Sequence, residues 1–393
     1  MEKRNCCGRE LSLLGFGLMR LPRIPGKPQD IDYKEAASLV DRAIAGGVNY
    51  FDTAYTYGGS EEFAGRALSR YPRDSYCLAT KCPPWMVRTS DDFERIFAEQ
   101  QRRCATDFFD FYLVHNMAKE SMRADGNAEY FKKFEQGGMY DMLRRKKDEG
   151  YIRRLGFSFH GTLDLLEKLV DQFEWDFAQI QLNYIDWTTT DAKRQYEILD
   201  LHGIPVVIME PLRGGALASL DAESTEILTR AKPNTSLASW GIRYAASFTN
   251  VITVLSGMNT MEQLDDNLAT MDGFMPVTDQ ERELLYEAAA AYSKSGVIAC
   301  TGCSYCIPCP HGVTIPRIFS IYNHYRLLNF RIPFDNGYAT LAESERASAC
   351  VGCGLCEQKC PQHLAISEYM REIDAFAKSP EKNKGTVPLF GSG

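Results

Sequence analysis

Two runs of closely spaced cysteines near the end of the sequence have the spacing of iron–sulfur ligands. The second run has the pattern C-x2-C-x2-C-x3-C-P, which is typical of proteins that bind cubane clusters. In the first run only two residues separate the third cysteine from Cys309, so the role of Cys309 stays open. The sequence predicts two [4Fe–4S] clusters, and the eight candidate ligands are Cys300, Cys303, Cys306, Cys309, Cys350, Cys353, Cys356 and Cys360.

The two runs are expected to exchange one ligand each. In two-cluster proteins the last cysteine of a run, the one before proline, ligates the other cluster. The two expected ligand sets are Cys300, Cys303 and Cys306 with Cys360, and Cys350, Cys353 and Cys356 with Cys309. A single cluster and structural zinc are the alternatives, since C-x2-C pairs also make four-cysteine zinc sites. Zinc sites need no Cys-Pro endings, so the pattern favours iron–sulfur clusters.

Three ionisable side chains of different types follow three consecutive predicted strands. Asp52, Lys81 and His115 stand at these strand ends, and Tyr57 comes five residues after Asp52. A phenol can donate the proton that carbonyl reduction needs, but its pKa of about 10 is too high unless a cation lies beside it. Lys81 can be that cation, Asp52 can keep it charged, and His115 can orient a carbonyl oxygen. Spacing alone leaves Tyr55 as a competing proton donor.

Short apolar runs alternate with amphipathic helical patterns from about residue 10 to residue 275. This alternation is typical of βαβ units, and eight such runs fit a (β/α)8 barrel, whose active sites lie at the C-terminal strand ends. The predicted strands are Leu14–Met19, Asn49–Phe51, Tyr76–Thr80, Phe109–Val114, Leu155–Phe157, Ala178–Leu182, Pro205–Met209 and Ile252–Leu255. The predicted helices are Tyr33–Ala45, Glu61–Arg70, Asp91–Arg103, Tyr140–Asp148, Leu163–Asp171, Asp191–Leu201, Leu237–Ala246, Met261–Met271 and Asp279–Ser293.

The composition changes after these elements, because Cys, Pro and aromatic residues become frequent from Cys300 to Pro361. A helical pattern at Pro316–Asn329 separates the two cysteine runs. We therefore expect an α/β protein with a TIM barrel over residues 1–293. A small α-helical ferredoxin-like iron–sulfur domain is expected over residues 294–378, and a loose tail over residues 379–393.

Charge and hydropathy exclude two classes of partner. The formal net charge is −8 and no basic tract is present, so we expect no nucleic acid. No stretch reaches the roughly 20 apolar residues that span a bilayer, so we expect no membrane. Residues 1–10 are polar and lack an apolar signal region. We therefore expect a cytoplasmic protein whose reduced thiols are available to metal.

Several runs resemble the aldo/keto reductase superfamily in order, spacing and strand placement over about residues 10–275. They are FDTAYTYGGSEEFAGRAL, LATKCPPW, DFFDFYLVH, GFSFHG, QIQLNY and MEPLRGGAL. The resemblance implies a catalytic tetrad of Asp52, Tyr57, Lys81 and His115, and the family pattern F-D-T-A-x-x-Y-G selects Tyr57. The presence of His115 implies carbonyl or alcohol chemistry. The cysteine-rich region is similar to that of bacterial and archaeal members with a C-terminal ferredoxin-like [4Fe–4S] extension.

The same resemblance implies residues that bind a nicotinamide dinucleotide. They are Ser158, Gln181 and Asn183 for the carboxamide, Tyr184 for stacking on the nicotinamide ring, Pro211, Leu212, Arg213 and Gly215 for the pyrophosphate, and Asp266 and Asn267 for the adenine. After the eighth strand, relatives that use NADPH carry cations around the 2′-phosphate, whereas this chain has Gly257, Met258 and Gln263. The uncharged loop favours NADH over NADPH, although a cation from another loop could replace the missing ones.

Two principal functions are compatible with this combination. The leading hypothesis is an NAD(P)H-dependent oxidoreductase that interconverts a small-molecule carbonyl and an alcohol. The alternative is an electron-transfer protein that passes single electrons between a ferredoxin or flavoprotein partner and a barrel-bound substrate. Hydride carries two electrons and a cluster moves one, so the alternative needs a converter such as a flavin, for which the sequence shows no signature. A third hypothesis is a regulatory barrel that senses redox state through its clusters.

Overall fold

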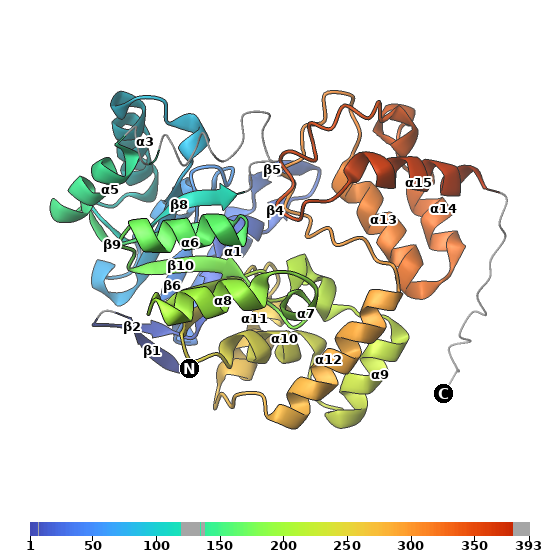
Figure 1. The fold of residues 1–393 in the computed structure, drawn as a ribbon, viewed down its shortest axis with the longest axis horizontal. Coiled ribbons are helices and arrows are strands. Elements are labelled where there is room, and N and C mark those ends of the chain that lie inside the picture. Colours follow the sequence, from blue (N-terminus) through green and yellow to red (C-terminus); the bar gives the residue numbers. More distant parts are fainter. Residues whose placement is uncertain (7, 119–133, 135–137, 380–393) are drawn as a thin grey trace. The chain divides into compact units, whose positions relative to one another are not determined.

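Eight parallel strands form a closed barrel in the computed structural model, which describes residues 1–6, 8–118, 134 and 138–379 (Figure 1). Around the barrel the strands follow the order β10-β11-β12-β3-β6-β7-β8-β9. They are β3 (Leu14–Gly17), β6 (Tyr50–Asp52), β7 (Cys77–Cys82), β8 (Phe109–Ala118), β9 (Ile152–His160), β10 (Phe177–Gln181), β11 (Val206–Met209) and β12 (Val251–Ser256). The predicted (β/α)8 barrel is confirmed, and each predicted strand overlaps an observed one.

The chain divides into two compact units. The first contains the barrel strands and comprises Met1–Glu120, Asp125–Leu212 and Ala238–Arg282. The second comprises Ser121–Ala124, which lies outside the described residues, Arg213–Leu237 and Glu283–Gly393. The segment that follows β11 therefore belongs to the same unit as the cysteine-rich region, although the barrel segment Ala238–Arg282 separates the two parts in the chain.

Helices with one apolar face cover the outside of the barrel. In α1 the buried residues Ala36, Leu39, Val40 and Ala43 recur every three or four positions and form one stripe. Asp32 caps this helix by accepting a hydrogen bond from the Glu35 backbone N at 3.1 Å. Among the described residues of this unit, the α-helices are α1 (Tyr33–Ala45), α2 (Ser60–Leu68), α3 (Ser90–Cys104), α5 (Met139–Asp148), α6 (Leu163–Gln172), α7 (Asp186–Thr189), α8 (Ala192–Leu201), α10 (Leu237–Ala246), α11 (Met261–Met271) and the start of α12 (Asp279–Lys294).

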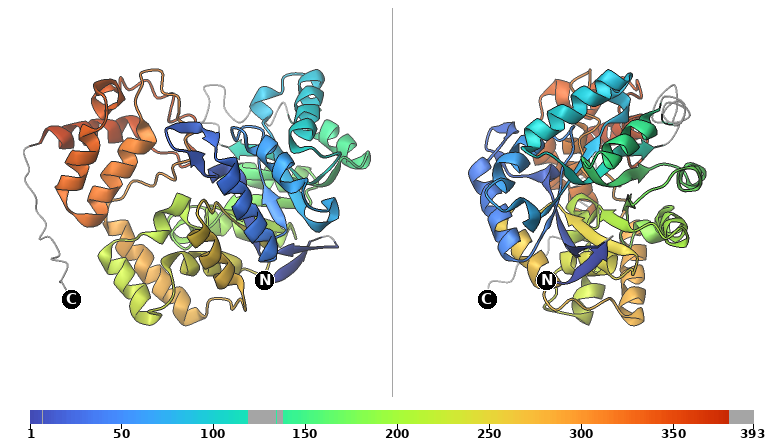
Figure 2. Two further views of the ribbon diagram at one scale, coloured as in Figure 1. Left: turned by 180° about the vertical axis from the view of Figure 1, so that it is seen from behind. Right: turned by 90° about the vertical axis from the view of Figure 1, so that its left-hand side faces the viewer.

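A hairpin of β1 (Lys3–Cys6) and β2 (Arg9–Ser12) precedes the barrel, and the sequence did not predict it. It is the dark blue ribbon beside the N label in Figure 2. Leu11 of the hairpin packs in one core cluster with Tyr50, Phe111 and Phe177 from the barrel interior. These barrel residues lie at or near the starts of their strands, so the hairpin covers the N-terminal end of the barrel. An active site is therefore expected at the opposite end of the barrel, where the strands have their C-terminal ends. A second short hairpin joins β4 (Arg23–Ile24) to β5 (Lys27–Ile31).

The second unit is helical within the described residues. Its core is aromatic, with the rings of Tyr325 and Phe376 4.5 Å apart and Phe334 packed against both. Helix α9 lies beside α12, where Ser224 Oγ donates to the Ala288 carbonyl at 3.0 Å (Figure 1). The helical segments are η5 (Arg213–Ala218), α9 (Ala222–Ala231), most of α12, α13 (Ile315–Leu328), α14 (Arg331–Ala339), η6 (Glu343–Glu345), η7 (Ala347–Ala349) and α15 (Ile366–Lys378).

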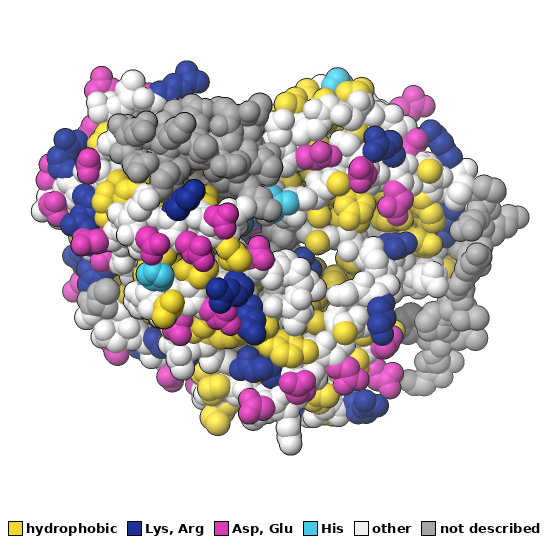
Figure 3. All heavy atoms as spheres, viewed as in Figure 1, with side chains coloured by type: hydrophobic (Ala, Val, Ile, Leu, Met, Phe, Trp, Pro, Cys, Tyr) yellow, Lys and Arg dark blue, Asp and Glu magenta, His cyan; other side chains and the backbone are white. Residues whose placement is uncertain are grey.

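The surface carries both signs of charge. On the face shown in Figure 3, Lys and Arg side chains are intermingled with Asp and Glu side chains. This pattern is typical of a solvated surface rather than of a one-sign binding tract. In the part of the chain that the structure describes, no helix combines the length and apolar character needed to cross a membrane.

Candidate active site

The predicted strand-end residues share the interior face of the barrel. Side chains alternate along a strand, so Asp52 lies on the same face of β6 as Tyr50, and Lys81 lies on the same face of β7 as Ala79. Tyr50 and Ala79 belong to the interior core cluster. His115 follows Leu113 of the same cluster by two positions on β8. The three polar side chains therefore enter the barrel at its C-terminal end, as the alternation predicts.

Lys81 and Asp52 form a buried ion pair at this end. Lys81 Nζ donates hydrogen bonds to Asp52 Oδ1 at 2.6 Å and to the Thr53 carbonyl at 2.8 Å. The two residues are 1% and 3% exposed. Burial lowers the pKa of Lys81 from its ordinary value, and the charge of Asp52 opposes this shift. Burial likewise raises the pKa of Asp52, and Lys81 opposes that shift. Each charge is therefore retained because of its partner.

Tyr57 and Tyr55 lie beside different cations. Lys81 Nζ is 4.9 Å from the centroid of the Tyr57 ring. The Tyr57 ring also meets the His115 ring edge to face, with 5.8 Å between centroids and 85° between planes. The ring of Tyr55 instead lies 4.5 Å from the guanidinium carbon of Arg103. The structure therefore brings Tyr57 together with Lys81 and His115, a choice that spacing alone left open.

His115 is buried in its neutral form. It is 3% exposed, and its ring lies 5.5 Å from the ring of Trp85. Burial lowers the pKa of His115 well below 6.5, and the charges of Lys81 and His160 lower it further. A neutral imidazole has one ring N–H to donate, so it can hydrogen-bond a carbonyl oxygen without adding a positive charge beside Lys81.

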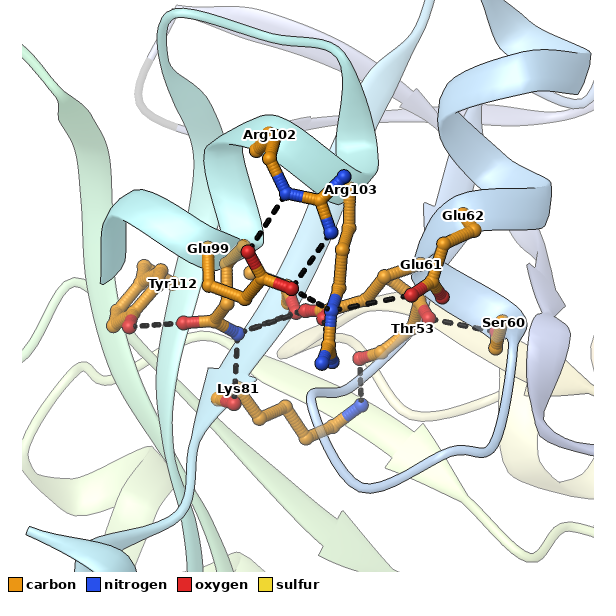
Figure 4. A network of polar contacts seen from close by, with 11 residues as sticks. Thr53, Ser60, Glu61, Glu62, Lys81, Glu99, Arg102, Arg103 and Tyr112 are labelled. Atoms are coloured by element: carbon orange, nitrogen blue, oxygen red, sulfur yellow. Dashed lines mark hydrogen bonds and ion pairs between the residues drawn. The ribbon is translucent and has the colours of Figure 1, made fainter. Parts of the chain in front are cut away.

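A hydrogen-bond network behind Lys81 fixes the end of β7 (Figure 4). Glu61 of α2 is 1% exposed, and its Oε1 accepts from Thr80 Oγ1 at 2.7 Å and from Gln100 Nε2 at 2.9 Å. Gln100 Nε2 also donates to the Lys81 carbonyl at 3.1 Å. Tyr112 donates to Gln100 Oε1 at 2.6 Å. The network anchors the backbone of Lys81, while Asp52 anchors its ammonium group.

Glu61 adds charge to this support. Its Oε2 lies 3.4 Å from Arg103 Nη1, and Arg103 also pairs with Glu62 and Glu99 (Figure 4). The negative charge of Glu61 raises the pKa of Lys81. No pattern in the sequence marks Glu61, because acidic residues are common in the first turn of a helix.

The predicted carboxamide residues differ in what they can offer to a ligand. Ser158 Oγ accepts a hydrogen bond from the Asn116 backbone N at 2.8 Å, which leaves its hydroxyl proton to donate elsewhere. Gln181 Nε2 and Asn183 Nδ2 both donate to Asp186 Oδ2, at 2.7 Å and 2.5 Å. Asp186 is a residue that the sequence analysis missed.

Tyr184, which the resemblance implies for stacking, has no exposed surface in this structure. Its ring packs edge to face on Tyr244 with 6.1 Å between centroids. Stacking on a ligand requires an accessible ring face, so Tyr184 contributes to packing here. Trp187 is also part of this packing, because its ring lies 4.7 Å from that of Phe248.

The predicted pyrophosphate loop crosses from one compact unit to the other. Pro211 and Leu212 belong to the barrel unit, and Arg213 and Gly215 to the second unit. Gly214 and Gly215 have φ angles of 68° and 99°, which favour glycine. A Cβ on Gly214 would lie 2.1 Å from the Thr301 carbonyl oxygen, so only glycine allows this approach. Thr301 directly follows the first candidate cluster ligand.

The loop after β12 has a cation beside it that the sequence analysis did not identify. The side chain of Arg20 lies 3.3–3.5 Å from the position that a Cβ on Gly257 would occupy. Arg20 Nη2 is paired with Glu210 Oε1 at 2.9 Å. Arg20 follows the first barrel strand, so a search of every strand end for charged residues would have found it. The residues of the loop itself are uncharged, as Gly257 and Gln263 suggested, but a positive charge lies next to the loop.

The remaining predicted adenine-side residues lie on or beside α11. Gln263 Oε1 accepts from the Asn259 backbone N at 3.0 Å and stabilises the start of the helix. Asn267 is 3% exposed and donates from Nδ2 to Ser256 Oγ at 2.9 Å. Asp266 precedes it in the helix. Two of the three side chains thus have local roles in joining α11 to β12.

Four cysteines line one pocket in the second unit. Cys300, Cys303 and Cys306 come from the first run and Cys360 from the second. The charges of the other three cysteines raise the pKa of Cys306, after burial as the larger cause. Phe319 is among the apolar residues that line the pocket. Converging thiols from both runs in an apolar pocket fit a cubane cluster, whose corners take one cysteine each.

Three of the other four cysteines lie against the core of the second unit, and the fourth is exposed. Cys309, Cys350 and Cys356 pack against the aromatic core of the second unit, and Cys353 is exposed. The charge of Cys350 raises the pKa of Cys356, after burial and Glu357. Among the described residues, no group of three or more His, Cys, Asp or Glu side chains could hold a single metal ion. The thiolates of a cubane bind different irons.

Fold and site together place the chain in the class of barrel oxidoreductases with an iron–sulfur domain. The profile of the aldo/keto reductase family matches residues 13–290, and the profile of a 4Fe-4S dicluster domain matches residues 299–365. The chain belongs to the aldo/keto reductase family. Both parts of the resemblance stated from the sequence are confirmed.

Curated relatives cover most of the barrel. An L-galactose dehydrogenase from Arabidopsis thaliana is 25% identical over 293 residues, which span 67% of this chain and 85% of that protein. An NADH-specific methylglyoxal reductase from Escherichia coli K12 is 22% identical over 332 residues, which span 72% of this chain and 96% of that protein.

Solved structures share the fold. The holo form of an aldo-keto reductase from Bacillus halodurans has a TM-score of 0.58 and 23% identity, and the match covers 73% of this chain and 96% of that one. An aldo/keto reductase from Klebsiella pneumoniae in complex with NADP and acetate has a TM-score of 0.57 and 19% identity, with 72% and 93% covered.

Proposed function

We propose that the protein interconverts a carbonyl and an alcohol with a nicotinamide dinucleotide as hydride carrier. One observation carries the proposal: the buried Lys81–Asp52 pair lies against the ring of Tyr57, and His115 meets the same ring. A phenol beside a retained positive charge has a lowered pKa and can exchange a proton near neutral pH.

The four residues have distinct proposed roles. Tyr57 gives its phenolic proton to the developing alkoxide during reduction and takes it back during oxidation. Lys81 stabilises the phenolate that remains, and Asp52 holds Lys81 charged in a buried place. Neutral His115 donates a hydrogen bond to the carbonyl oxygen and orients it toward Tyr57. Trp85, whose ring lies against His115, supplies an apolar wall for the substrate.

The dinucleotide, when bound, supplies or accepts the hydride. We propose that Ser158 and Gln181 hold its carboxamide. We propose NADH as the coenzyme, supported by the uncharged residues Gly257, Met258 and Gln263, by the pairing of the neighbouring Arg20 with Glu210, and by the NADH-specific relative. The relatives named as a methylglyoxal reductase and an L-galactose dehydrogenase support a small hydroxyl- or carbonyl-bearing substrate.

Replacement of Tyr57 with Phe tests the proposal directly. Tyr57→Phe should reduce turnover of reactive carbonyls such as methylglyoxal by at least about 1,000-fold, because the proton donor is lost. NADH binding, measured by quenching of protein fluorescence, should change little. Tyr55→Phe is the matched control, because Tyr55 lies beside Arg103 and should be replaceable with little effect. Retained turnover in Tyr57→Phe would refute the assignment.

The second unit is proposed to hold two [4Fe–4S] clusters, which supply one-electron chemistry when bound. The first would use Cys300, Cys303, Cys306 and Cys360, and the second Cys350, Cys353, Cys356 and Cys309. Anaerobically purified protein should contain about eight irons per chain, from four in each cluster. Cys303→Ser should lower this number to about four, whereas Cys104→Ser, outside both runs, should leave it unchanged.

Electron transfer to a partner is the second candidate function, and exposure of the second cysteine run favours it. Cys353 is exposed, and its neighbours Val351 and Leu355 are 63% and 47% exposed. Electron exchange with a ferredoxin or flavoprotein requires a ligand loop that a partner can approach. The test mixes the anaerobic protein with NADH and follows the visible absorbance. Bleaching without added flavin supports an internal route, and unchanged absorbance contradicts one.

A further inference from the structure

Asp186 is a buried carboxylate that joins two of the predicted carboxamide residues. It is the first residue of α7 and is 1% exposed. Its Oδ2 accepts hydrogen bonds from Gln181 Nε2 at 2.7 Å and from Asn183 Nδ2 at 2.5 Å. A buried carboxylate costs free energy unless it is hydrogen-bonded, so these two amides stabilise Asp186 where it lies, and Asp186 in turn fixes the two amides.

Asn183 uses all of its hydrogen-bonding groups within the chain. Its Nδ2 donates to Asp186 Oδ2 and to the Glu210 carbonyl, the latter at 3.1 Å. Its Oδ1 accepts from the backbone N of Ile185 at 3.1 Å and of Asp186 at 2.9 Å. An asparagine side chain has two N–H donors and two lone pairs on its oxygen, so none remains for a ligand. Asn183 builds the turn between β10 and α7 and holds Asp186 in place.

Gln181 is the residue that Asp186 can orient toward a ligand. It lies on the same face of β10 as Phe177, which belongs to the interior core, so it points into the barrel at the C-terminal end of the strand. A carboxylate only accepts hydrogen bonds, so the nitrogen of the Gln181 amide faces Asp186. The amide is planar, and its oxygen is therefore directed away from Asp186.

We propose that Asp186 is a positioning residue that makes Gln181 present its carbonyl oxygen to the amide NH2 of the nicotinamide. The inference rests on the proposed function. It deepens that function because it says how Asp186 lets Gln181 distinguish the NH2 group of the nicotinamide from other substituents. Asp186 does not touch the coenzyme itself. Without its carboxylate, the amide of Gln181 can present either its oxygen or its nitrogen, and a carboxamide is no longer distinguished from a methyl ketone.

Three reduced dinucleotides test this inference through binding alone. NADH carries the amide NH2, the 3-acetylpyridine analogue has a methyl group in its place, and the thionicotinamide analogue keeps the NH2 but replaces the carbonyl oxygen with sulfur. The wild-type protein should bind NADH about tenfold more tightly than the acetylpyridine analogue, because one hydrogen bond is lost and a polar group is left unpaired. It should distinguish NADH from the thionicotinamide analogue less strongly, since both carry the NH2.

Variants at position 186 show whether Asp186 orients the amide of Gln181 or only stabilises the fold. Asp186→Leu removes the acceptor for Gln181. The ratio of the dissociation constant of the acetylpyridine analogue to that of NADH should then fall to about one. Asp186→Asn keeps an oxygen that can accept from Gln181 and should retain most of the ratio. Asp186→Ala repeats the comparison without added bulk, in case the leucine is not accommodated. An unchanged ratio in both Asp186→Leu and Asp186→Ala overturns the proposal, as does an equal loss of affinity for both dinucleotides.

A Gln181→Met variant tests whether the effect passes through Gln181. It should lose the same discrimination, and combining it with Asp186→Leu should cause no further loss. Additive losses would show that Asp186 acts elsewhere and would overturn the proposal. Failure of the wild-type protein to bind either NADH or NADPH would instead refute the proposed function. The two failures are therefore distinguishable.

Discussion

Lys81 Nζ lies 2.6 Å from Asp52 Oδ1, and this pair joins the ends of two neighbouring barrel strands. Neither side chain is exposed enough for water to replace its partner. The pair makes a positive charge available inside an apolar barrel, where an isolated ammonium group would lose its proton. The ring of Tyr57 lies against that charge.

Asp52→Asn should impair catalysis through Lys81. The amide cannot balance the ammonium charge, so the pKa of Lys81 should fall further and Tyr57 should lose its cationic neighbour. We expect kcat/KM for the carbonyl substrate to fall by about 100-fold. The free energy of unfolding should fall by about 3 kcal/mol, as measured in urea. Asp41→Asn, in an exposed pair with Arg70, should change both quantities little.

Glu61→Gln should move the pH profile without removing the network. Glutamine keeps an oxygen that can accept from Thr80 and Gln100, but the negative charge near Lys81 is lost. Because the charge of Glu61 raises the pKa of Lys81, its removal should lower that pKa. The basic limb of the pH profile of kcat/KM should therefore move to lower pH, by roughly 0.5–1 pH unit. Glu62→Gln is the control, because the carboxylate of Glu62 also pairs with Arg103 but is exposed to solvent. An identical profile for Glu61→Gln and wild type would contradict the electrostatic role.

His115 should make the protein less stable in mild acid. Its pKa in the folded state is lowered well below 6.5 by burial, so the unfolded chain binds a proton that the folded chain resists. The stabilising contribution is present above pH 6.5, the ordinary pKa of the unfolded side chain, and is lost as pH falls toward the folded pKa. His115→Gln should flatten this dependence in urea unfolding at pH 5 and pH 7.5. His324→Gln, at an exposed position, should not.

The Arg20–Glu210 pair should influence coenzyme choice. Arg20 lies beside Gly257, and its guanidinium pairs with the carboxylate of Glu210. This pairing competes with any contact between Arg20 and the 2′-phosphate of NADPH. Glu210→Gln should free its guanidinium and tighten NADPH binding by about three- to tenfold relative to NADH. Arg20→Gln in the same background should cancel that gain. Titration of each variant with both dinucleotides measures the ratio, and a ratio that does not move would exclude Arg20 from the 2′-phosphate position.

Much of the site was predictable because strand ends converge in a parallel barrel. Asp52, Lys81 and His115 needed only correct strand assignments and the alternation of side chains, and the described structure brings them together. Arg20 and Glu210 were not predictable in this way, since 190 positions separate them and no local pattern marks their contact. Asp186 was not predictable from the sequence, because acidic residues are common in the first turn of any helix.

The barrel, the cysteine-rich domain and the residue types available to chemistry could all be predicted from the sequence, because periodicity and ligand spacing are local properties of the chain. Spacing left both Tyr57 and Tyr55 open and the family pattern favoured Tyr57, but only the folded chain shows that Lys81 lies beside the Tyr57 ring and Arg103 beside the Tyr55 ring. Tertiary structure also decided that Asn183 is already satisfied. Residue type fixes how many hydrogen bonds a side chain can make, but only the positions of its neighbours fix which of them remain for a ligand.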